Sequence, residues 1–209
     1  MNDRFLLLPQ EKQQKIINAG YKVFSENPYK KSPISEISDE AGISKALLFH
    51  YFHNKRDFYL YLFDHAKQIT NAELLRDGIP ESADFFALLE KSLSAKCSLT
   101  REYPYISAFS LRAFYEQESE IKDSIHGVFW DLYRENNTVL QKSIASTRFR
   151  EGVDLVLLFQ EITWAMNGYM HMVYMSGNIN ADKIESDLSQ LIAFWKKIYL
   201  KDEESNHVV

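Results

Sequence analysis

The stretch from Ser32 to Phe58 constrains the fold of this chain more than any other. It opens with a short amphipathic segment in which Ile34, Ile37 and Ala41 recur at the spacing of one helix face. Ser32 is placed to cap this helix. The proline that follows suits the first helical position, because the N–H that proline lacks has no intrahelical partner there. The pattern therefore predicts a short helix that buries one face.

A second short helix is expected directly after the first. Gly42 should end the first helix, and Ser44 is placed to cap the second, which we expect over Lys45 to Tyr51. Two short helices at a tight turn form a helix-turn-helix pattern. The second helix carries small, basic and hydrogen-bonding side chains near its N-terminus, where a helix in the DNA major groove meets base edges and phosphates.

Three sequence features around this turn occur in one register. They are the turn Ala41-Gly42-Ile43-Ser44-Lys45, the aromatic run Phe49-His50-Tyr51-Phe52, and Lys55 three residues later. Together they resemble the N-terminal DNA-binding domain of the TetR (tetracycline repressor) family, over roughly residues 10 to 65. The resemblance implies a dimeric transcriptional repressor that leaves a palindromic double-stranded DNA operator when a small-molecule effector binds its C-terminal domain.

The resemblance also implies which residues meet DNA. Packing inside the small domain is the alternative for His50 and Tyr51, and a solvated charge pair is the alternative for Lys30 and Lys31. The residues implied as DNA contacts are Lys30, Lys31, Ser44, Lys45, Ala46, Leu47, His50, Tyr51 and Lys55.

Helical periodicity extends on both sides of this pattern. Gln10 to Asn27 should form a supporting helix, and Asn54 should cap another that runs to about Thr70. Glycine and proline between Leu74 and Pro80 break the pattern. We therefore expect a helix-turn-helix DNA-binding domain over residues 1–55, joined through a helix over 56–70 to a helical ligand-binding and dimerisation domain over 71–209.

The rest of the chain also shows helical spacing, and nothing alternates at the period of a strand for long. The fold class is therefore expected to be all-α, a three-helix helix-turn-helix domain followed by a helical bundle, with about nine helices. The helices expected are one capped by Ser82, then Pro104 to Tyr115, Glu118 to Ser146, Val153 to Ser176 ended by Gly177, and a last one capped by Asn180.

The last two expected helices indicate a dimer. The first is apolar on nearly all sides, and a helix buried all round needs neighbours that one subunit of this size would not supply. Paired with their symmetry mates, the two helices would form a four-helix homodimer interface, which is also where the family dimerises. The alternative is internal core of a monomer. Interface residues expected are Leu158, Ala165, Gly168, Met172, Leu188, Leu191 and Trp195.

Composition bears on the effector. Fourteen Phe, twelve Tyr and three Trp make an aromatic-lined cavity plausible, although a large core is the plainer reading. An apolar or aromatic effector would suit such a cavity, with Arg112 or His171 available for a carboxylate or hydroxyl. Candidate lining residues are Tyr105, Phe109, Arg112, Phe114, Tyr133, Trp164, Asn167 and His171.

The sequence offers little support for an enzyme. One cysteine, Cys97, excludes an internal disulfide and a Cys-based zinc site, and no carboxylate or His recurs at metal-ligand spacing beside His50 and His53. Neither a nucleophile elbow nor a phosphate-cradling loop occurs. We expect no enzymatic activity, metal or cofactor. The alternative function is an all-helical small-molecule binder or enzyme whose N-terminal domain does not act on DNA.

Charge is distributed unevenly along the chain. Residues 1–67 hold ten Lys/Arg and eight Asp/Glu, a net charge of +2. Since the whole chain has a net charge of −5, residues 68–209 have a net charge of −7. A DNA reader needs only a local basic face. The apolar run Phe5 to Leu8 is too short for a signal peptide and should pack as an arm on the body. We expect no membrane partner and a cytoplasmic, nucleoid-associated protein.

Overall fold

The chain folds into two compact helical units in a computed structural model that describes residues 3–76 and 84–201. One unit comprises Met1–Arg76 and Ser98–Glu135, and the other comprises Asp77–Cys97 and Asn136–Val209. The only β-pairing in the described ranges is an isolated bridge between Phe149 and Leu200. The all-α prediction is confirmed.

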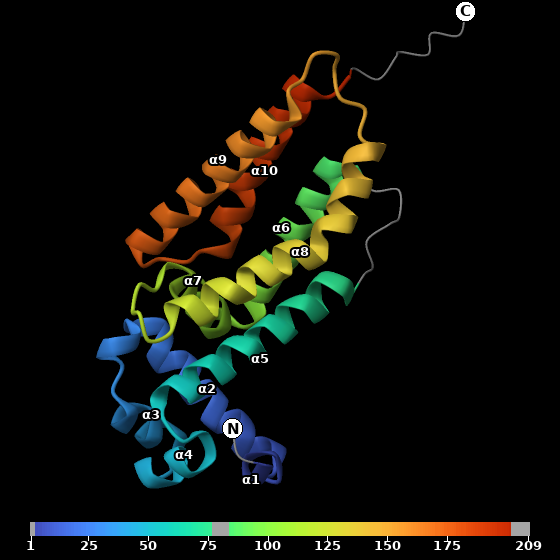
Figure 1. Cartoon of the computed structure of the whole chain (residues 1–209). Helices are drawn as coiled ribbons and strands as arrows, with labels where there is room; N and C mark the ends of the chain where they lie inside the picture. The colour runs from blue at the N-terminus through green and yellow to red at the C-terminus, as the bar shows by residue number, and fades with distance from the viewer. Residues whose placement is uncertain (1–2, 77–83, 202–209) are drawn as a thin grey trace, which may run out of the picture. The chain divides into compact units, whose positions relative to one another are not determined.

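Ten α-helices and one 3₁₀-helix, η1, span the described residues (Figure 1). Two elements, α1 and η1, are too short to show a helical period, which is why the sequence predicted only about nine. The elements are α1 (Asp3–Leu6), α2 (Gln10–Glu26), η1 (Tyr29–Lys31), α3 (Ile34–Ala41), α4 (Lys45–Phe52), α5 (Lys55–Arg76), α6 (Phe85–Glu102), α7 (Pro104–Tyr115), α8 (Lys122–Ser146), α9 (Leu155–Ser176) and α10 (Ala181–Tyr199).

The first unit reaches further along the chain than the predicted boundary near residue 70. Helix α7 and the start of α8 join it because their apolar side chains enter the same core as α2 and α5. Phe109 of α7 is fully buried, and its ring centroid lies 5.3 Å from that of Tyr21 and 4.8 Å from that of Tyr59. Ile121 and Ile125 are buried in the same cluster.

Side-chain caps set several helix ends as the sequence predicted. The Oγ of Ser44 accepts from Leu47 N at 3.1 Å, and the Oδ1 of Asn54 accepts from Asp57 N at 2.8 Å. Asn180 caps α10 in the same way, and Gly177 ends α9 with φ 66°. These caps satisfy backbone N–H groups that have no partner inside the helix.

Ser32 is not the cap that the sequence predicted for α3. Pro33 occupies the cap position with no side-chain hydrogen bond, and the buried Ser32 hydroxyl donates instead to the backbone oxygens of Asn27, at 3.3 Å, and Pro28, at 3.0 Å. Ser82, the predicted cap of α6, lies outside the described residues. The side chain of Asp84 accepts from Ala87 N at 2.8 Å at that helix start.

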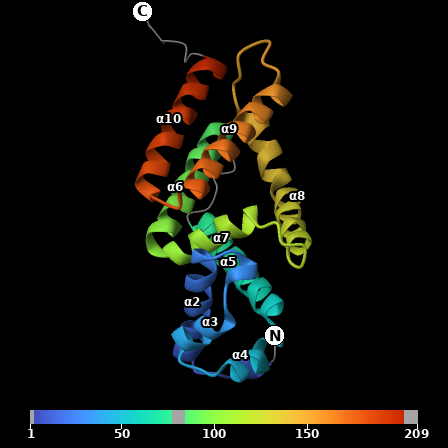
Figure 2. The ribbon, with the colours of Figure 1, turned by 90° about the vertical axis from the view of Figure 1, so that its left-hand side faces the viewer.

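The second unit contains α9 and α10 as an antiparallel pair that lies side by side in both ribbon views (Figures 1 and 2). Leu158 of α9 and Trp195 of α10 are buried in one core with Phe86 of α6. The carboxylate of Glu161 on α9 accepts hydrogen bonds from α10, at 3.1 Å from Trp195 Nε1 and 2.5 Å from Tyr199 Oη. This pair is therefore fixed by packing and by polar contacts.

Candidate DNA interface and effector residues

The turn between α3 and α4 holds the second helix in the geometry of a DNA reader. Gly42 adopts φ 68° and ψ 34°, a left-handed conformation that glycine takes without strain. Its N–H donates to Asp39 O and that of Ile43 donates to Ser38 O, both at 3.0 Å, which closes the end of α3. Ile37 and Leu48 are fully buried beneath the turn, so α4 has one face in the core and one outside.

The exposed face of α4 carries most of the side chains predicted to meet DNA. Ser44, Lys45, Ala46, Leu47 and His50 are all exposed at the surface of the first unit. The Lys45 ammonium lies 5.7 Å from the centre of the Phe49 ring, and Leu47 keeps 36% of its surface exposed. The structure therefore exposes Ser44 to Leu47 at the N-terminal turn of α4 and His50 one turn further along.

Tyr51 differs from the predicted DNA-contacting role. Only 7% of its surface is exposed, and its ring packs edge-on against that of Phe5 at 5.8 Å. Tyr51 lies on the core side of α4, where its ring packs against the N-terminal arm. Of the two readings that the sequence left open for Tyr51, the structure supports packing inside the domain.

The predicted backbone contacts lie beside one another on η1 and at the start of α5. Lys30 and Lys31 are exposed. The Lys55 ammonium lies 4.7 Å from the centre of the Tyr29 ring and donates to Lys30 O at 3.5 Å. Partial burial lowers the pKa of Lys55, while the carboxylates of Glu120 and Glu116 oppose that shift. The group is therefore held against η1 rather than extended into solvent.

An acidic segment between α7 and α8 contacts this basic loop, a contact that the sequence analysis did not predict. The Tyr29 N–H donates to the Glu116 carboxylate at 2.9 Å, and Lys30 Nζ lies 3.8 Å from Glu118 Oε2. Arg56 Nε donates to Glu120 O at 2.9 Å, and its Nη2 lies 3.0 Å from the hydroxyl of Ser124. These partners are more than sixty residues apart in the chain, so no local pattern could have revealed them.

The predicted effector residues are divided between the two units. Phe109 lies in the core of the first unit, which leaves it no surface for a ligand. Arg112 uses its Nε to donate to Ser25 O at 2.9 Å, which ties α7 to α2. Phe114 is exposed and its ring packs edge-on against that of Tyr115. The side chain of Tyr133 lies outside the described residues. Trp164, Asn167 and His171 are exposed on α9 in the second unit.

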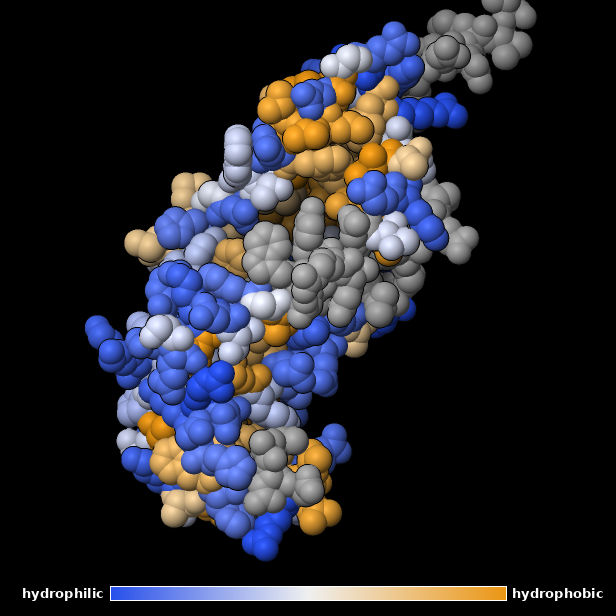
Figure 3. Space-filling model, viewed as in Figure 1, coloured by the Kyte–Doolittle hydropathy of each residue, from blue (hydrophilic) through white to orange (hydrophobic). Residues whose placement is uncertain are grey.

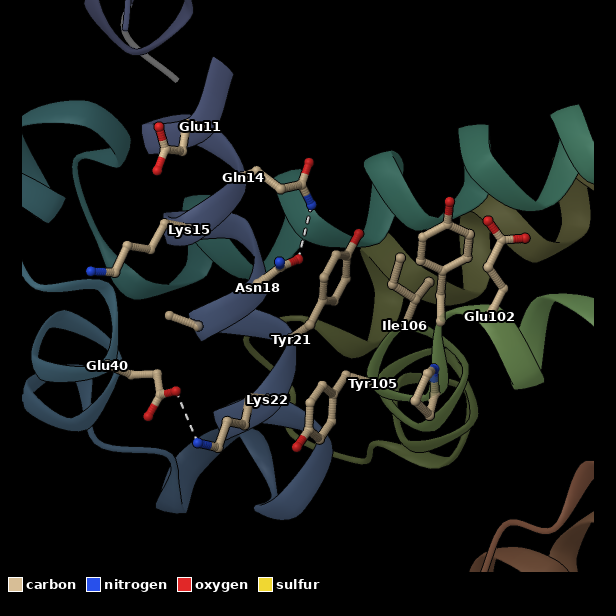
Figure 4. Close-up of a pocket in the computed structure, with 13 residues that line it drawn as sticks. Glu11, Gln14, Lys15, Asn18, Tyr21, Lys22, Glu40, Glu102, Tyr105 and Ile106 are labelled. Atoms are coloured by element: carbon tan, nitrogen blue, oxygen red, sulfur yellow. Dashed lines mark hydrogen bonds and ion pairs between the residues drawn. The ribbon is translucent and has the colours of Figure 1, made fainter. Parts of the chain in front are cut away.

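Tyr105 lines a groove in the first unit. A groove of about 670 Å³ runs between α2 and the α6–α7 junction (Figure 4). Lys22 and Glu40 form a 2.9 Å ion pair on one side of it, and Tyr105 points toward Lys22. The groove is polar where α2 and α3 form it, which differs from the apolar, aromatic cavity that the sequence suggested.

The predicted dimer residues separate into core and surface. Leu158, Leu188 and Trp195 have at most 5% of their surface exposed inside one chain, so they cannot form the contact surface for a second. Gly168 and Met172 are exposed on α9, and Ala165 and Leu191 are half-buried. The predicted interface did not include other apolar side chains that are exposed on the two helices: Val156, Leu157, Trp164, Met175, Phe194 and Ile198.

Apolar surface gathers where α9 begins and α10 ends (Figure 3). Exposed residues recur along α9 at steps of seven, four, four and three, which places them on one stripe: Leu157, Trp164, Gly168, Met172 and Met175. Exposed apolar patches of this kind mark protein-protein contact sites.

No group of three His, Cys, Asp or Glu side chains is placed to hold a metal ion within the ranges described. None of the helices in those ranges is long and apolar enough to cross a membrane.

Comparisons with known proteins agree with this architecture. Residues 16–62 match the family model of bacterial regulatory proteins of the tetR family. The chain is 26% identical over 178 residues to the fatty acid metabolism regulator protein of Bacillus subtilis (strain 168). The aligned residues cover 80% of this chain and 91% of that protein.

Solved structures show the same fold at low identity. A transcriptional regulator FadR from Bacillus subtilis, in complex with stearoyl-CoA, has a TM-score of 0.66 at 23% identity, over 86% of this chain and 96% of that one. A TetR family transcriptional regulator from Chloroflexus aurantiacus has a TM-score of 0.63 at 22% identity, over 96% and 99% of the chains. The TetR family protein CprB from S. coelicolor A3(2) has a TM-score of 0.70 at 14% identity, over 96% of this chain and 94% of that one.

Proposed function

We propose that the chain is a transcriptional repressor of the tetR family that binds a palindromic operator as a dimer, since residues 16–62 match the family model of bacterial regulatory proteins of the tetR family. The observation that carries this function is α4 itself. A glycine turn and a serine cap leave Ser44, Lys45, Ala46 and Leu47 exposed at its N-terminal turn. Small side chains and a cation at the start of an exposed helix suit the major groove.

Dimerisation supplies the second half-site contact. Stripes on α9 and α10 expose aromatic and aliphatic side chains, including Trp164 and Phe194 at 68% and 54%. An isologous interface built from these helices would place two copies of α4 on one duplex. Half-sites then lie about 34 to 36 Å apart, one helical turn, which is why a dimer reads a palindrome.

We further propose that the effector has a long apolar chain, and that a long-chain acyl thioester is the first candidate to test. The fatty acid metabolism regulator and the stearoyl-CoA complex support this class, since both belong to proteins similar to this chain along most of its length. In the second unit, Met166 and Met170 are partly buried and, like Phe159, pack against the core. Met side chains adapt readily to flexible apolar partners.

The effector would act by linkage. A ligand that binds better to one arrangement of the protein shifts the equilibrium toward it and weakens DNA binding by the same factor. The acidic segment that grips Tyr29, Lys30 and Arg56 offers a route for this coupling, because it contacts the basic loop directly. A small movement of that segment would change the phosphate contacts.

Selection of bound duplexes from random DNA by the full-length protein tests this function. A palindromic sequence with half-sites one helical turn apart is the expected outcome, and an absence of any enriched sequence would refute the repressor reading. Stearoyl-CoA should then release the selected duplex, whereas coenzyme A and stearate serve as controls for the headgroup and the chain. Release by neither stearoyl-CoA nor stearate would exclude the acyl effector and leave the DNA-binding function standing.

A further inference from the structure

The N-terminal arm is packed onto the recognition helix. Phe5 of α1 is fully buried, and its ring centroid lies 5.8 Å from Tyr51 and 4.7 Å from Phe52, both on α4, and 5.6 Å from Tyr61 on α5. Three aromatic contacts on one buried side chain hold the arm firmly. Helix α1 is thus positioned by α4.

Hydrogen bonds fix the other end of the arm to α2. The Gln13 amide donates to Leu6 O at 3.2 Å and to Leu8 O at 2.8 Å, while Leu8 N donates to Phe5 O at 3.1 Å. The arm therefore forms a closed turn, anchored at Phe5 and at Gln13. Side chains on its outer surface are consequently held in defined places relative to α4.

Arg4 projects from this arm beside the end of the recognition helix. Its Nη1 lies 3.1 Å from Nε2 of His50, and both residues are exposed. A guanidinium only donates hydrogen bonds, so Nε2 is the acceptor in this pair. Arg4 thereby places a permanent positive charge next to a residue of α4 on the face that we assign to DNA.

Two lysines of α2 lie at the opposite end of α4. A groove of about 620 Å³ is lined by Lys12 and Lys15 on one side and by the turn residues Gly42 and Ser44 on the other. The Lys15 ammonium reaches across the turn, to within 3.1 Å of where a side chain on Gly42 would begin. Glu11 also lines this groove, so its charge is mixed.

The recognition helix needs such neighbours because it is poor in cations. Lys45 is the only Lys or Arg in α4, and the residues after it are Ala46, Leu47, Leu48 and Phe49. The free energy of DNA binding comes largely from phosphates neutralised by Lys and Arg. An exposed helix with one such residue leaves that task to the elements around it.

We propose that α1 and the first turns of α2 form a second DNA-contacting element, in which Arg4 binds the phosphate backbone at the His50 end of α4 and Lys12 and Lys15 bind it at the Ser44 end. This inference rests on the proposed DNA-binding function and extends it to a segment outside the helix-turn-helix. The three cations lie near the two ends of α4, where the phosphate backbone borders a helix in the major groove.

Replacing Arg4 by Gln in the full-length protein tests the proposal, with Arg76→Gln as the matched control. Arg76 is also exposed, and it is the last residue of α5, twenty-one residues after the start of that helix. Its replacement by Gln changes the net charge by the same amount as Arg4→Gln, but far from α4. The measurement is the dissociation constant for the selected duplex across a range of salt concentrations. Each lost phosphate contact should lower the slope of log affinity against log salt by about 0.9, or about 1.8 for two subunits.

Arg4→Lys separates a DNA contact from a structural role. Lysine keeps the charge, so its salt slope should match that of the wild type even if affinity falls somewhat. The proposal is supported if Arg4→Gln alone flattens the slope. It is overturned if Arg4→Gln and Arg76→Gln give the same slope, or if Arg4→Lys loses as much slope as Arg4→Gln. A wild-type protein that shows no steep salt dependence on any duplex would instead refute the DNA-binding function itself.

Discussion

Replacing Gly20 by Ala tests the packing that supports the recognition helix. Gly20 lies in the middle of α2, where alanine would ordinarily be favoured by about 1 kcal/mol because of its higher helix propensity. A Cβ there would lie 2.6 Å from Leu62 Cδ1 and from Phe58 Cζ, both on α5. Ordinary carbon contacts are about 3.5 to 4.0 Å, so the overlap approaches 1 Å on two side chains.

Neither neighbour can move aside at low cost, since Phe58 is 1% and Leu62 0% exposed. Overpacking of this kind costs up to about 3 kcal/mol, and two overlapping side chains place Gly20→Ala at that upper end. After the propensity gain of about 1 kcal/mol is subtracted, the free energy of unfolding should fall by about 2 kcal/mol. For a chain of this size the unfolding midpoint should fall by about 4 to 8 °C.

Gly127→Ala is the matched control, because a Cβ at this helical position meets nothing within 4 Å. It should raise the unfolding free energy by about 0.5 to 1 kcal/mol through helix propensity alone. Thermal and urea unfolding of both variants measure the contrast. A Gly20→Ala protein as stable as Gly127→Ala would show that α2 and α5 are not in close contact, and the packing argument would be wrong.

Three further perturbations address the interface, the dimer and pH. Glu116→Gln keeps an acceptor for the Tyr29 N–H but removes a negative charge that acts on Lys55. Operator affinity at low salt should therefore rise by about two- to fivefold, as for an exposed charge interaction of up to about 1 kcal/mol. Unchanged affinity in titrations would show that the acidic segment does not oppose DNA binding. Trp164→Ala removes an aromatic side chain that is 68% exposed. A Trp that anchors the dimer should contribute at least about 2 kcal/mol to the free energy of association, so its loss should raise the dimer dissociation constant by about thirtyfold. Sedimentation equilibrium measures this, with the exposed Tyr103→Ala as control, and equal dissociation constants would move the interface elsewhere. Burial lowers the pKa of His65 below its unfolded value, so the folded state favours the neutral ring; the unfolding free energy should be complete above about pH 6.5 and decline as pH falls through the folded pKa. His65→Gln should flatten that decline in urea titrations at pH 7.5 and 5.5, and an unchanged slope would assign the pH dependence to other groups.

Local signals predicted the recognition helix well. Gly42 predicts a turn because glycine tolerates a positive φ, and Ser44 predicts a helix cap because its hydroxyl can accept a backbone hydrogen bond. The structure places both residues as expected. Amphipathic spacing likewise located the main helices of both units. Ser32 was misassigned because a serine before a proline has two uses, and here its hydroxyl closes the preceding loop.

Long-range contacts set the limit of the sequence analysis. Nothing near Arg56 indicates that it bonds to Glu120, and nothing near Phe5 indicates that it packs on Tyr51. The buried face of α9 contains Leu158, while its exposed face contains the equally apolar Leu157 and Trp164. Hydrophobic character alone cannot separate these faces, so core and surface residues were mixed in the predicted dimer interface.

The dependence of operator affinity on salt tests the central claim most directly. Full-length protein is titrated with its best selected duplex and with a scrambled duplex, from low to near-physiological salt. We predict a steep inverse dependence on both, with the selected duplex bound at least about a thousandfold more tightly. Weak affinity that ignores both salt and sequence would contradict the account, because α4 and the cations around it would then not be a DNA-reading surface.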